Sequence, residues 1–149
     1  MIEIKIREIK YNSDEYRKEL ELRDAVLRKP LGMNIYNDNL DADKTDFHIG
    51  AFINNQLVGV MILAKLNADD LKMRQVAVDE KLRANKIGSE MVHFAEEYSK
   101  DQGFKNIVLN ARKSALGFYQ KLGYEKISAE FLEINIPHYK MCKRVSHFF

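Results

Sequence analysis

A short apolar strand that runs through a basic turn into an amphipathic helix, within residues 73–98, places the firmest limit on how this chain can fold. The strand ends at Val78, and the turn from Leu82 to Gly88 brings basic side chains and a glycine to the point where the helical pattern begins. From Ile87 onward, apolar side chains recur at the spacing of a helix that has one buried stripe. The predicted stripe consists of Met91, Phe94, Ala95 and Tyr98.

The opening of this helix predicts a site for an anionic group. The first backbone N–H groups of a helix lack intrahelical partners, and the helix start carries about half a positive charge. The side chains of Arg83 and Lys86 would add full charges there. The sequence contains neither G-x-x-x-x-G-K-[ST] nor G-x-G-x-x-G, which excludes the two best known phosphate loops. A phosphate turn of another kind is one interpretation, and a solvated basic turn is the other.

The composition is that of one globular domain. The chain has 149 residues, of which 46% are hydrophobic and 31% charged, and its net charge of +2 is too balanced to indicate nucleic acid or a membrane surface. The single cysteine, Cys142, excludes an internal disulfide and indicates a cytoplasmic setting. The four histidines are scattered and make no ligand-spaced cluster with that cysteine, so no metal site is expected.

The first residues predict a strand followed by a helix. Isoleucines alternate with charged residues from Ile2 to Arg7, which is the period of a strand with one buried face. Asn12 and Glu15 have the spacing of a capping box, and a proline and a glycine would end the helix near Arg28. The helical repeat comprises Tyr16, Glu19, Leu20, Leu22, Arg23, Val26 and Leu27.

A loop and three strands precede the basic turn. Residues Met33 to Lys44 are polar and rich in Asn and Asp, which predicts an irregular loop, and a loop of this length is often functional. The apolar runs Phe47 to Ile53 and Leu57 to Leu66 meet at Asn54 and Asn55, whose side chains tolerate the left-handed conformation of a tight hairpin. A second reversal leads to the strand Leu71 to Val78. The three strands predict an antiparallel meander.

The residues after the central helix predict a parallel strand pair. Gly103 would end the helix, and the β-branched run Ile107 to Leu109 indicates a buried strand. Because a helix connects it to the strand Leu71–Val78, the two strands are expected to be parallel.

The remaining residues predict one more helix and two strands. Ala115 to Leu122 has helical apolar spacing, and Gly123 would end this helix. The final strands are predicted at Tyr124 to Glu133 and at His138 to Lys143, with Pro137 between them.

Two segments resemble the GNAT superfamily of acyl-CoA N-acyltransferases. Arg83 to Gly88 is similar to its [RQ]-x-x-G-x-[GA] loop, although Lys86 stands where that family usually has its first glycine. Leu109 to Tyr124 is similar to its pattern N-A-x-x-x-A-x-x-F-Y-x-x-x-G-[FY]. The resemblance covers the chain from residue 46 to the end. It implies a single mixed α/β domain over residues 1–149, with a mostly antiparallel central sheet, one parallel strand pair splayed around acyl-CoA, and helices on both faces.

The resemblance also implies roles for individual residues, with acetyl-CoA as the co-substrate. Backbone groups of Val76 and Val78 would pair with the pantetheine arm as an added strand. The loop amides and the Arg83 side chain would hold the pyrophosphate, and Tyr119 matches the usual general acid. The implied cofactor-binding residues are Val76, Ala77, Val78, Arg83, Asn85, Lys86, Ile87, Gly88, Ser89, Asn110, Ser114 and Phe118.

A tyrosine suits the position of the general acid. Attack by an amine on a thioester forms an oxyanion and expels a thiolate, whose pKa is about 8.5 if it behaves like that of cysteine. A tyrosine has a pKa of about 10 and is protonated at neutral pH. The Tyr119 hydroxyl could therefore donate its proton to the leaving sulfur of the thioester. A backbone N–H near Val76 could stabilise the oxyanion.

The acceptor side is less determined by the sequence. Gln75 lies beside the expected splay and is a candidate substrate-binding residue, but it cannot act as a base. His138 is the best candidate for accepting a proton by its ordinary pKa, and a subset of GNAT proteins has a similar late I-P-H-x-x-M segment. His138 could therefore be a catalytic residue or a structural histidine that holds a loop, and the sequence leaves both roles open.

Arg28 would pair an acidic substrate or lie solvated at a helix end. Cys142 lies four residues beyond His138, ~13 Å away along a strand, so a thiol nucleophile is not expected.

These observations predict an N-acetyltransferase that transfers the acetyl group of acetyl-CoA to a primary amine of a small molecule or a protein. The alternative is a non-catalytic acyl-CoA sensor that keeps the cofactor cleft. Neither a nucleic acid nor a membrane is an expected partner, and dimers are common among the proteins that the sequence resembles.

Overall fold

The structure, a computed structural model, describes residues 3–146, with the backbone alone for residues 83–85. The strands are β1 (Lys5–Ile9), β2 (Phe47–Ile53), β3 (Gln56–Lys65), β4 (Asp70–Val78), β5 (Asn106–Arg112), β6 (Glu125–Lys126), β7 (Phe131–Glu133) and β8 (Ile136–Arg144). The α-helices are α1 (Asp14–Arg23), α2 (Ile87–Asp101) and α3 (Leu116–Lys121). Shorter helical turns cover Asp24–Arg28, Lys29–Leu31, Ile35–Asn37, Leu40–Thr45, Glu80–Asn85 and Lys113–Ala115.

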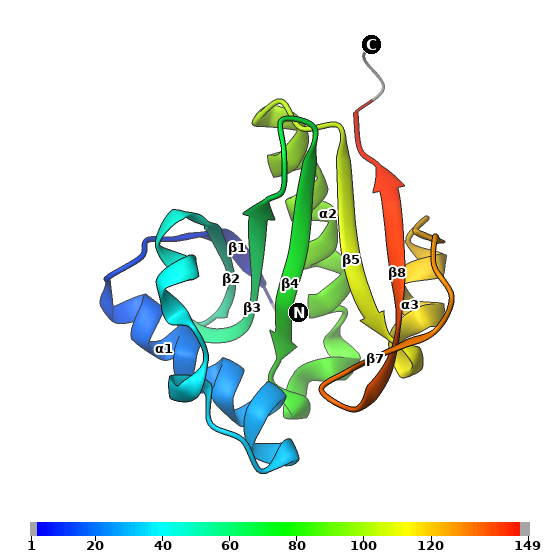
Figure 1. The fold of residues 1–149 in the computed structure, drawn as a ribbon. Coiled ribbons are helices and arrows are strands. Elements are labelled where there is room, and N and C mark those ends of the chain that lie inside the picture. The colour runs from blue at the N-terminus through cyan, green and yellow to red at the C-terminus, as the bar shows by residue number, and fades with distance from the viewer. Residues whose placement is uncertain (1–2, 147–149) are drawn as a thin grey trace. The chain divides into compact units, whose positions relative to one another are not determined.

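The strands form one mixed sheet (Figure 1). They are hydrogen-bonded in the order β1-β2-β3-β4-β5-β8-β6, and β7 also pairs with β8. Strands β4 and β5 are parallel, whereas β1 with β2, β2 with β3, and β8 with each of its partners are antiparallel. The predicted parallel pair is confirmed, as is the mixed α/β class. None of the helices in residues 3–146 is long and apolar enough to cross a membrane.

The chain forms two compact units. The first comprises Met1–Ala64 and Gln75–Ala95, and the second comprises Lys65–Arg74 and Glu96–Phe149. Strand β4 and helix α2 each begin in one unit and end in the other.

Helix α1 of the first unit begins one residue later than predicted. Ser13, not Asn12, is its N-cap, since the Ser13 hydroxyl accepts a hydrogen bond of 3.2 Å from the Tyr16 amide. Asn12 has a left-handed backbone (φ 66) and lies before the cap, so the predicted capping box with Glu15 is wrong. The helical path continues through the π-helical turn Asp24–Arg28, as expected. Ile2 of the predicted first strand lies outside the described residues.

The hairpin and the core of the first unit follow the sequence closely. Asn54 (φ 50) and Asn55 (φ 64) occupy the left-handed positions of the β2–β3 turn. A core of buried apolar side chains joins β1, β2, β3 and β4, and apolar side chains of α1 and the turn after it pack against this core. The core members are Ile9, Phe52, Val60 and Ala77.

The first turns of α2 lie close against strand β3. A Cβ atom added to Gly59 would come within 3.0 Å of the Met91 Sδ atom and 3.1 Å of the Ile87 Cγ2 atom, so the glycine permits this approach. The buried side chains of the helix are Ile87, Met91, Val92, Ala95 and Ser99. The predicted stripe was therefore right for Met91 and Ala95, whereas Phe94 and Tyr98 are only half-buried.

In the second unit the end of the chain differs from the prediction. Residues 124–133 do not form one strand, but two short strands, β6 and β7. The reversal before β8 occurs at Ile134 (φ 52) and Asn135 (φ 58), and Pro137 lies within β8. Gly103 (φ 90) and Gly123 (φ 95) end α2 and α3 in the left-handed conformation, as predicted.

Candidate active site

A tight turn connects strand β4 to helix α2 in the first unit. The Asp79 amide donates a hydrogen bond of 2.8 Å to the Val58 carbonyl, which ties the end of β4 to β3. The Asp79 carboxylate accepts from the Lys81 amide at 3.0 Å and caps the short helical turn Glu80–Asn85. The Lys86 carbonyl then accepts from the Glu90 amide at 3.1 Å and from the Ser89 hydroxyl at 3.1 Å. The turn therefore leads directly into the first turn of α2.

Lys86 has the backbone of a glycine position. Its φ of 60° and ψ of 20° are left-handed, and it directly precedes Ile87, the first residue of α2. A non-glycine residue in this conformation costs about 1–2 kcal/mol. The loop thus keeps the backbone that the GNAT-like pattern would have with a glycine, and its exposed lysine adds a cation at the helix opening. Ile87 is buried, and Gly88 and Ser89 are half-buried. The side chains of Arg83 and Asn85 lie outside the described part of the structure.

Strand β4 contains a second strained residue. Gln75 has a φ of 54°, which interrupts the regular pleat of the strand. Beyond it, Ala77 is buried and Val76 and Val78 are half-buried. A left-handed residue within a strand turns the neighbouring peptide groups away from the regular hydrogen-bond ladder. Their amides are thus candidates for binding a substrate.

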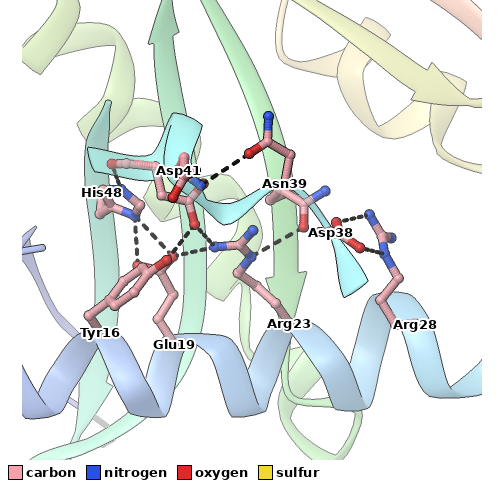
Figure 2. A network of polar contacts seen from close by, with 10 residues as sticks. Tyr16, Glu19, Arg23, Arg28, Asp38, Asn39, Asp41 and His48 are labelled. Carbon is pink, nitrogen blue, oxygen red and sulfur yellow. Dashed lines mark hydrogen bonds and ion pairs between the residues drawn. The ribbon is translucent and has the colours of Figure 1, made fainter. Parts of the chain in front are cut away.

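Helix α1 contributes Tyr16, Glu19 and Arg23 to a buried polar network in the first unit (Figure 2). The Arg23 Nε atom donates to the Gln75 Oε1 atom at 3.2 Å, and Arg23 Nη1 donates to Glu19 at 2.9 Å and to Asp43 at 2.8 Å. The Tyr16 hydroxyl donates to Asp43 at 2.7 Å. The side chains of Arg23, Glu19 and Asp43 are each no more than 1% exposed. Helix α1 is therefore fixed to strand β4 and to the turn Leu40–Thr45.

His48 completes the charge balance of this network. Its Nδ1 atom lies 2.9 Å from both carboxylate oxygens of Glu19, and its Nε2 atom lies 2.7 Å from the Asp43 carbonyl oxygen. Burial alone would lower the pKa of His48, but the hydrogen bonds and charges of Glu19 and Asp43 outweigh burial and raise the pKa above its ordinary value. Both ring nitrogens face acceptors, so the imidazolium form fits this position. Two cations, Arg23 and His48, then balance two carboxylates.

This network was not predicted from the sequence. Tyr16, Glu19 and Arg23 were expected in the helical repeat of the first helix, without a function. A signal was present, because Glu19 and Arg23 have the i, i+4 spacing of an ion pair and share the repeat with Leu20, which is buried. Charged residues on an apolar stripe indicate a buried ion pair. Asp43 and His48, which lie more than 15 residues further along the chain, could not be assigned as its partners.

Arg28 is also paired within the first unit. Its Nε and Nη2 atoms donate to the two Asp38 carboxylate oxygens at 3.0 and 2.8 Å, and Nη1 donates to the Leu27 carbonyl at 3.1 Å. The Arg28 side chain is 8% exposed, so the alternative of a solvated helix-end arginine is wrong. This bidentate pair ties the end of the first helical region to the polar loop before β2 (Figure 2).

Tyr119 lies on helix α3 in the second unit. Its ring packs edge-on against Phe118, at a centroid distance of 5.0 Å, and against Tyr124, at 5.8 Å. Burial raises the pKa of Tyr119 to about 12. The hydroxyl is therefore fully protonated at neutral pH. Phe118 is 40% exposed and Ser114 is exposed.

The second unit brings Asn110 and His138 to the same carboxylate. The Asn110 amide donates to Glu133 Oε1 at 3.1 Å, and His138 Nε2 lies 3.4 Å from Glu133 Oε2. The His138 Nδ1–H donates to the Ile136 carbonyl at 2.7 Å, and the ring is stacked on Phe131 at 5.9 Å. His138 is 5% exposed. His138 thus holds the β7–β8 turn through the Ile136 carbonyl and also faces the Glu133 carboxylate.

Cys142 of the second unit does not have the properties of a nucleophile. It lies on β8, four residues beyond His138, and burial together with the charges of Asp70 and Glu125 raises the pKa of its thiol. No group of three potential metal ligands is found in the described part of the chain. Of the residues predicted to have functional roles, the first unit contains Arg28, Gln75, residues 76–78, Arg83 and residues 85–89, and the second contains Asn110, Ser114, Phe118, Tyr119 and His138.

Comparisons with known proteins agree with this architecture. The model of the acetyltransferase (GNAT) domain matches residues 14–145. The uncharacterized protein YyaT of Bacillus subtilis is 35% identical over 99 residues, which cover 66% of each chain. A second Bacillus subtilis protein, BSU40680, which is provisionally named an acetyltransferase, is 32% identical over 127 residues, 83% of this chain and 86% of its own. The solved structure of an aminoglycoside 6'-N-acetyltransferase complexed with coenzyme A aligns over 95% of this chain and 97% of its own, with a TM-score of 0.81 and 16% identity. At that identity the likeness concerns the fold alone.

Proposed function

The chain belongs to the GNAT family of acetyltransferases, and on that premise we propose that it transfers the acetyl group of acetyl-CoA to a primary amine, with Tyr119 as the general acid. The observation that carries the proposal is the buried Tyr119 side chain on helix α3, where burial raises the pKa to about 12, so that the hydroxyl keeps its proton at neutral pH. A protein that only senses acyl-CoA would need the cofactor cleft but no proton donor. The acceptor is an amine of a small molecule or a peptide.

The residues of the first unit fit the anionic half of acetyl-CoA. The left-handed Lys86 turn precedes a helix of 15 residues, whose opening amides and partial positive charge suit a pyrophosphate. We assign the amides of Lys86, Ile87 and Gly88 to this group, with the Arg83 side chain. Asn85 and Ser89 would lie beside it. Val76, Ala77 and Val78 would present backbone groups to the pantetheine arm, and Asn110, Ser114 and Phe118 would line its thiol end.

The chemistry requires two proton movements. The amine nitrogen forms a bond to the thioester carbonyl carbon, the carbon–sulfur bond breaks, and the Tyr119 hydroxyl gives its proton to the departing sulfur. An amide beside Gln75 would donate to the carbonyl oxygen as negative charge develops on it. The amine loses one proton in exchange, and this proton passes to His138 and returns through water to Tyr119, which restores both residues. The products are the N-acetylated amine and the free thiol of coenzyme A.

His138 is the proposed acceptor of the amine proton. Its Nδ1–H is held by the Ile136 carbonyl, so the lone pair of the neutral ring is on Nε2, which faces Glu133 at 3.4 Å. Arg28 and Gln75 are proposed for the acceptor side, with Arg28 acting through its hold on the polar loop.

A thiol-release assay tests the proposal. The protein is incubated with acetyl-CoA and, in turn, spermidine, lysine, kanamycin and a peptide with a free amino terminus, and free thiol is measured. Release that depends on one of these amines, with the acetylated product detected by mass spectrometry, is the expected result. Calorimetric binding of acetyl-CoA without release in any reaction would favour the sensor, and the absence of binding would refute both functions.

A further inference from the structure

Gln75 and Arg23 form a contact that the proposed chemistry does not by itself explain. Glutamine has no special tolerance of the left-handed conformation, yet Gln75 adopts it within strand β4. Its side-chain oxygen accepts a hydrogen bond from Arg23 Nε. A strained residue within a strand persists only where its surroundings hold it, and strain of this kind is concentrated at functional sites.

The Arg23 guanidinium is well suited to hold another group in place. Its Nη1 atom is fixed by Glu19 and Asp43, its side chain is 1% exposed, and Asp43 is in turn fixed by the Tyr16 hydroxyl. A guanidinium is planar, so fixing one nitrogen fixes the direction of the remaining N–H groups. The Nε–H that reaches Gln75 therefore has little freedom. Pairing of Glu19 with His48 completes the balance of charges around the buried arginine.

We propose that Arg23 is a positioning residue for acetyl transfer: it holds Gln75 in the left-handed conformation, and Gln75 in turn sets the direction of the adjacent backbone amide that binds the acyl oxygen. This inference rests on the proposed function, because it assigns the strained segment of β4 to the carbonyl oxygen of the thioester. Arg23 touches no substrate in this role. It acts through one side-chain hydrogen bond and the backbone dihedral that this bond maintains.

Substitutions at positions 23 and 75 can remove the parts of the Arg23–Gln75 contact one at a time. A lysine at position 23 would keep the positive charge between Glu19 and Asp43, but it offers no second nitrogen in a fixed fork that could reach Gln75. A leucine at position 75 would keep the size of the side chain and lose the acceptor. A glycine at position 75 would also lose the acceptor, but it adopts a positive φ without steric strain. The three substitutions therefore separate charge, anchoring and backbone conformation.

The test measures kcat and KM for acetyl-CoA in Gln75→Leu, Gln75→Gly, Arg23→Lys and the double variant Arg23→Lys/Gln75→Leu, with the most reactive amine among spermidine, lysine, kanamycin and the peptide. We expect Gln75→Leu to lower kcat about 10- to 100-fold, with KM for acetyl-CoA changed by less than about 3-fold, because a misdirected oxyanion donor affects mainly the transition state. Gln75→Gly should lose less than Gln75→Leu. The double variant should be no slower than Gln75→Leu, since Arg23 acts through Gln75.

A second measurement does not depend on activity. Crystal structures of the wild-type protein and of Arg23→Lys give the φ angle of residue 75 directly, and we expect it to be positive in the first and negative in the second. The matched control is Arg17→Lys, an exposed arginine on the same helix that pairs with Asp14, and it should change neither kcat nor this angle.

The outcomes distinguish this inference from the proposed function. An active wild-type protein with an equally active Gln75→Leu variant would overturn the inference alone. Independent, multiplied losses in the double variant, or a positive φ at residue 75 in an Arg23→Lys protein of normal turnover, would also overturn it. A wild-type protein that binds acetyl-CoA but acetylates no amine would instead refute the proposed function, and the φ angle would still decide whether Arg23 holds Gln75.

Discussion

The Nδ1 atom of His48 lies 2.9 Å from each carboxylate oxygen of Glu19, within the interior of the first unit. This pair joins strand β2 to helix α1 and is 1% exposed on the histidine side and fully buried on the glutamate side. Removal of His48 would leave the buried Glu19 carboxylate with Arg23 as its remaining cationic partner in the network. The pair thus has consequences for the dependence of stability on pH.

Stability should fall as the pH rises through the titration of His48. Burial lowers the folded-state pKa of His48, but the hydrogen bonds and charge of Glu19 outweigh burial. The folded-state pKa is therefore raised above its ordinary value of about 6.5. Its contribution is therefore fully present below about pH 6.5 and is lost as the pH rises through the folded-state pKa. Urea unfolding from pH 6 to 9 measures this trend.

The variant His48→Gln is the control for that trend. It should lower the free energy of unfolding by about 2 kcal/mol at pH 6, because Glu19 loses one of its two buried cationic partners and keeps only Arg23, which it shares with Asp43. The difference between wild type and variant should shrink toward pH 9. A difference that stays constant over this range would show that His48 does not titrate there.

Tyr119→Phe should lower turnover by about 100-fold while the acetyl-CoA affinity stays nearly unchanged, because the substitution removes a proton donor and keeps the buried ring. Steady-state kinetics and calorimetry with acetyl-CoA measure the two effects. The pKa of Tyr119, about 12, also predicts that its ionisation leaves kcat unaffected up to about pH 10. An unchanged turnover number in Tyr119→Phe would remove this residue from the mechanism.

Lys86→Gly should separate the strain of the loop from its charge. Glycine relieves the left-handed backbone, and we expect the free energy of unfolding to rise by up to about 1 kcal/mol. If the lysine contacts a phosphate, acetyl-CoA should bind several-fold more weakly at low salt, and the matched variant Lys86→Ala should show the same loss of affinity without the gain in stability. Equal affinities in all three proteins would assign Lys86 no contact with the cofactor.

Asp38→Ala should destabilise the polar loop before β2. Arg28 is 8% exposed, and without Asp38 its guanidinium would lose both bonds of a bidentate pair, which we expect to cost about 2 kcal/mol in thermal or urea unfolding. The exposed pair Arg17–Asp14 provides the comparison, because Arg17→Ala should cost less than about 0.5 kcal/mol. Similar losses in both variants would mean that the Arg28 pair contributes no more than a surface pair.

The sequence was informative where local rules decide the structure. The pair Asn54-Asn55 predicted a left-handed turn, Gly103 and Gly123 predicted helix ends, and each adopts the expected backbone. The glycine-like position within Arg83–Gly88 was also visible, because the rest of the turn followed a recognisable pattern. The family followed from Arg83–Gly88 together with Leu109–Tyr124, and it is confirmed by the domain match.

The wrong predictions of the first helix cap and of the last reversal arose where two nearby residues suited the same position almost equally well. Asn12 and Ser13 are both good caps, but Asn12 has a left-handed backbone, and the Ser13 hydroxyl accepts from the Tyr16 amide. The reversal before the last strand was predicted at Pro137, but it occurs at Ile134 and Asn135, and Pro137 lies within β8. A proline is tolerated in a strand at a position where no neighbouring strand needs its backbone N–H.

The amino-acid order alone determined the main helices, the antiparallel β2–β3 hairpin, the parallel pair reached by the helix crossover and the family, since these depend on side-chain period, turn residues and short motifs. The tertiary structure alone decided which charges are buried together and how the strand beside them is bent. Tyr16, Glu19 and Arg23 come from one helix, whereas Asp43, His48 and Gln75 come from segments 20 to 59 residues further along. Buried charges are stabilised only by partners at hydrogen-bond distance, and chain folding, not sequence spacing, brings those partners together.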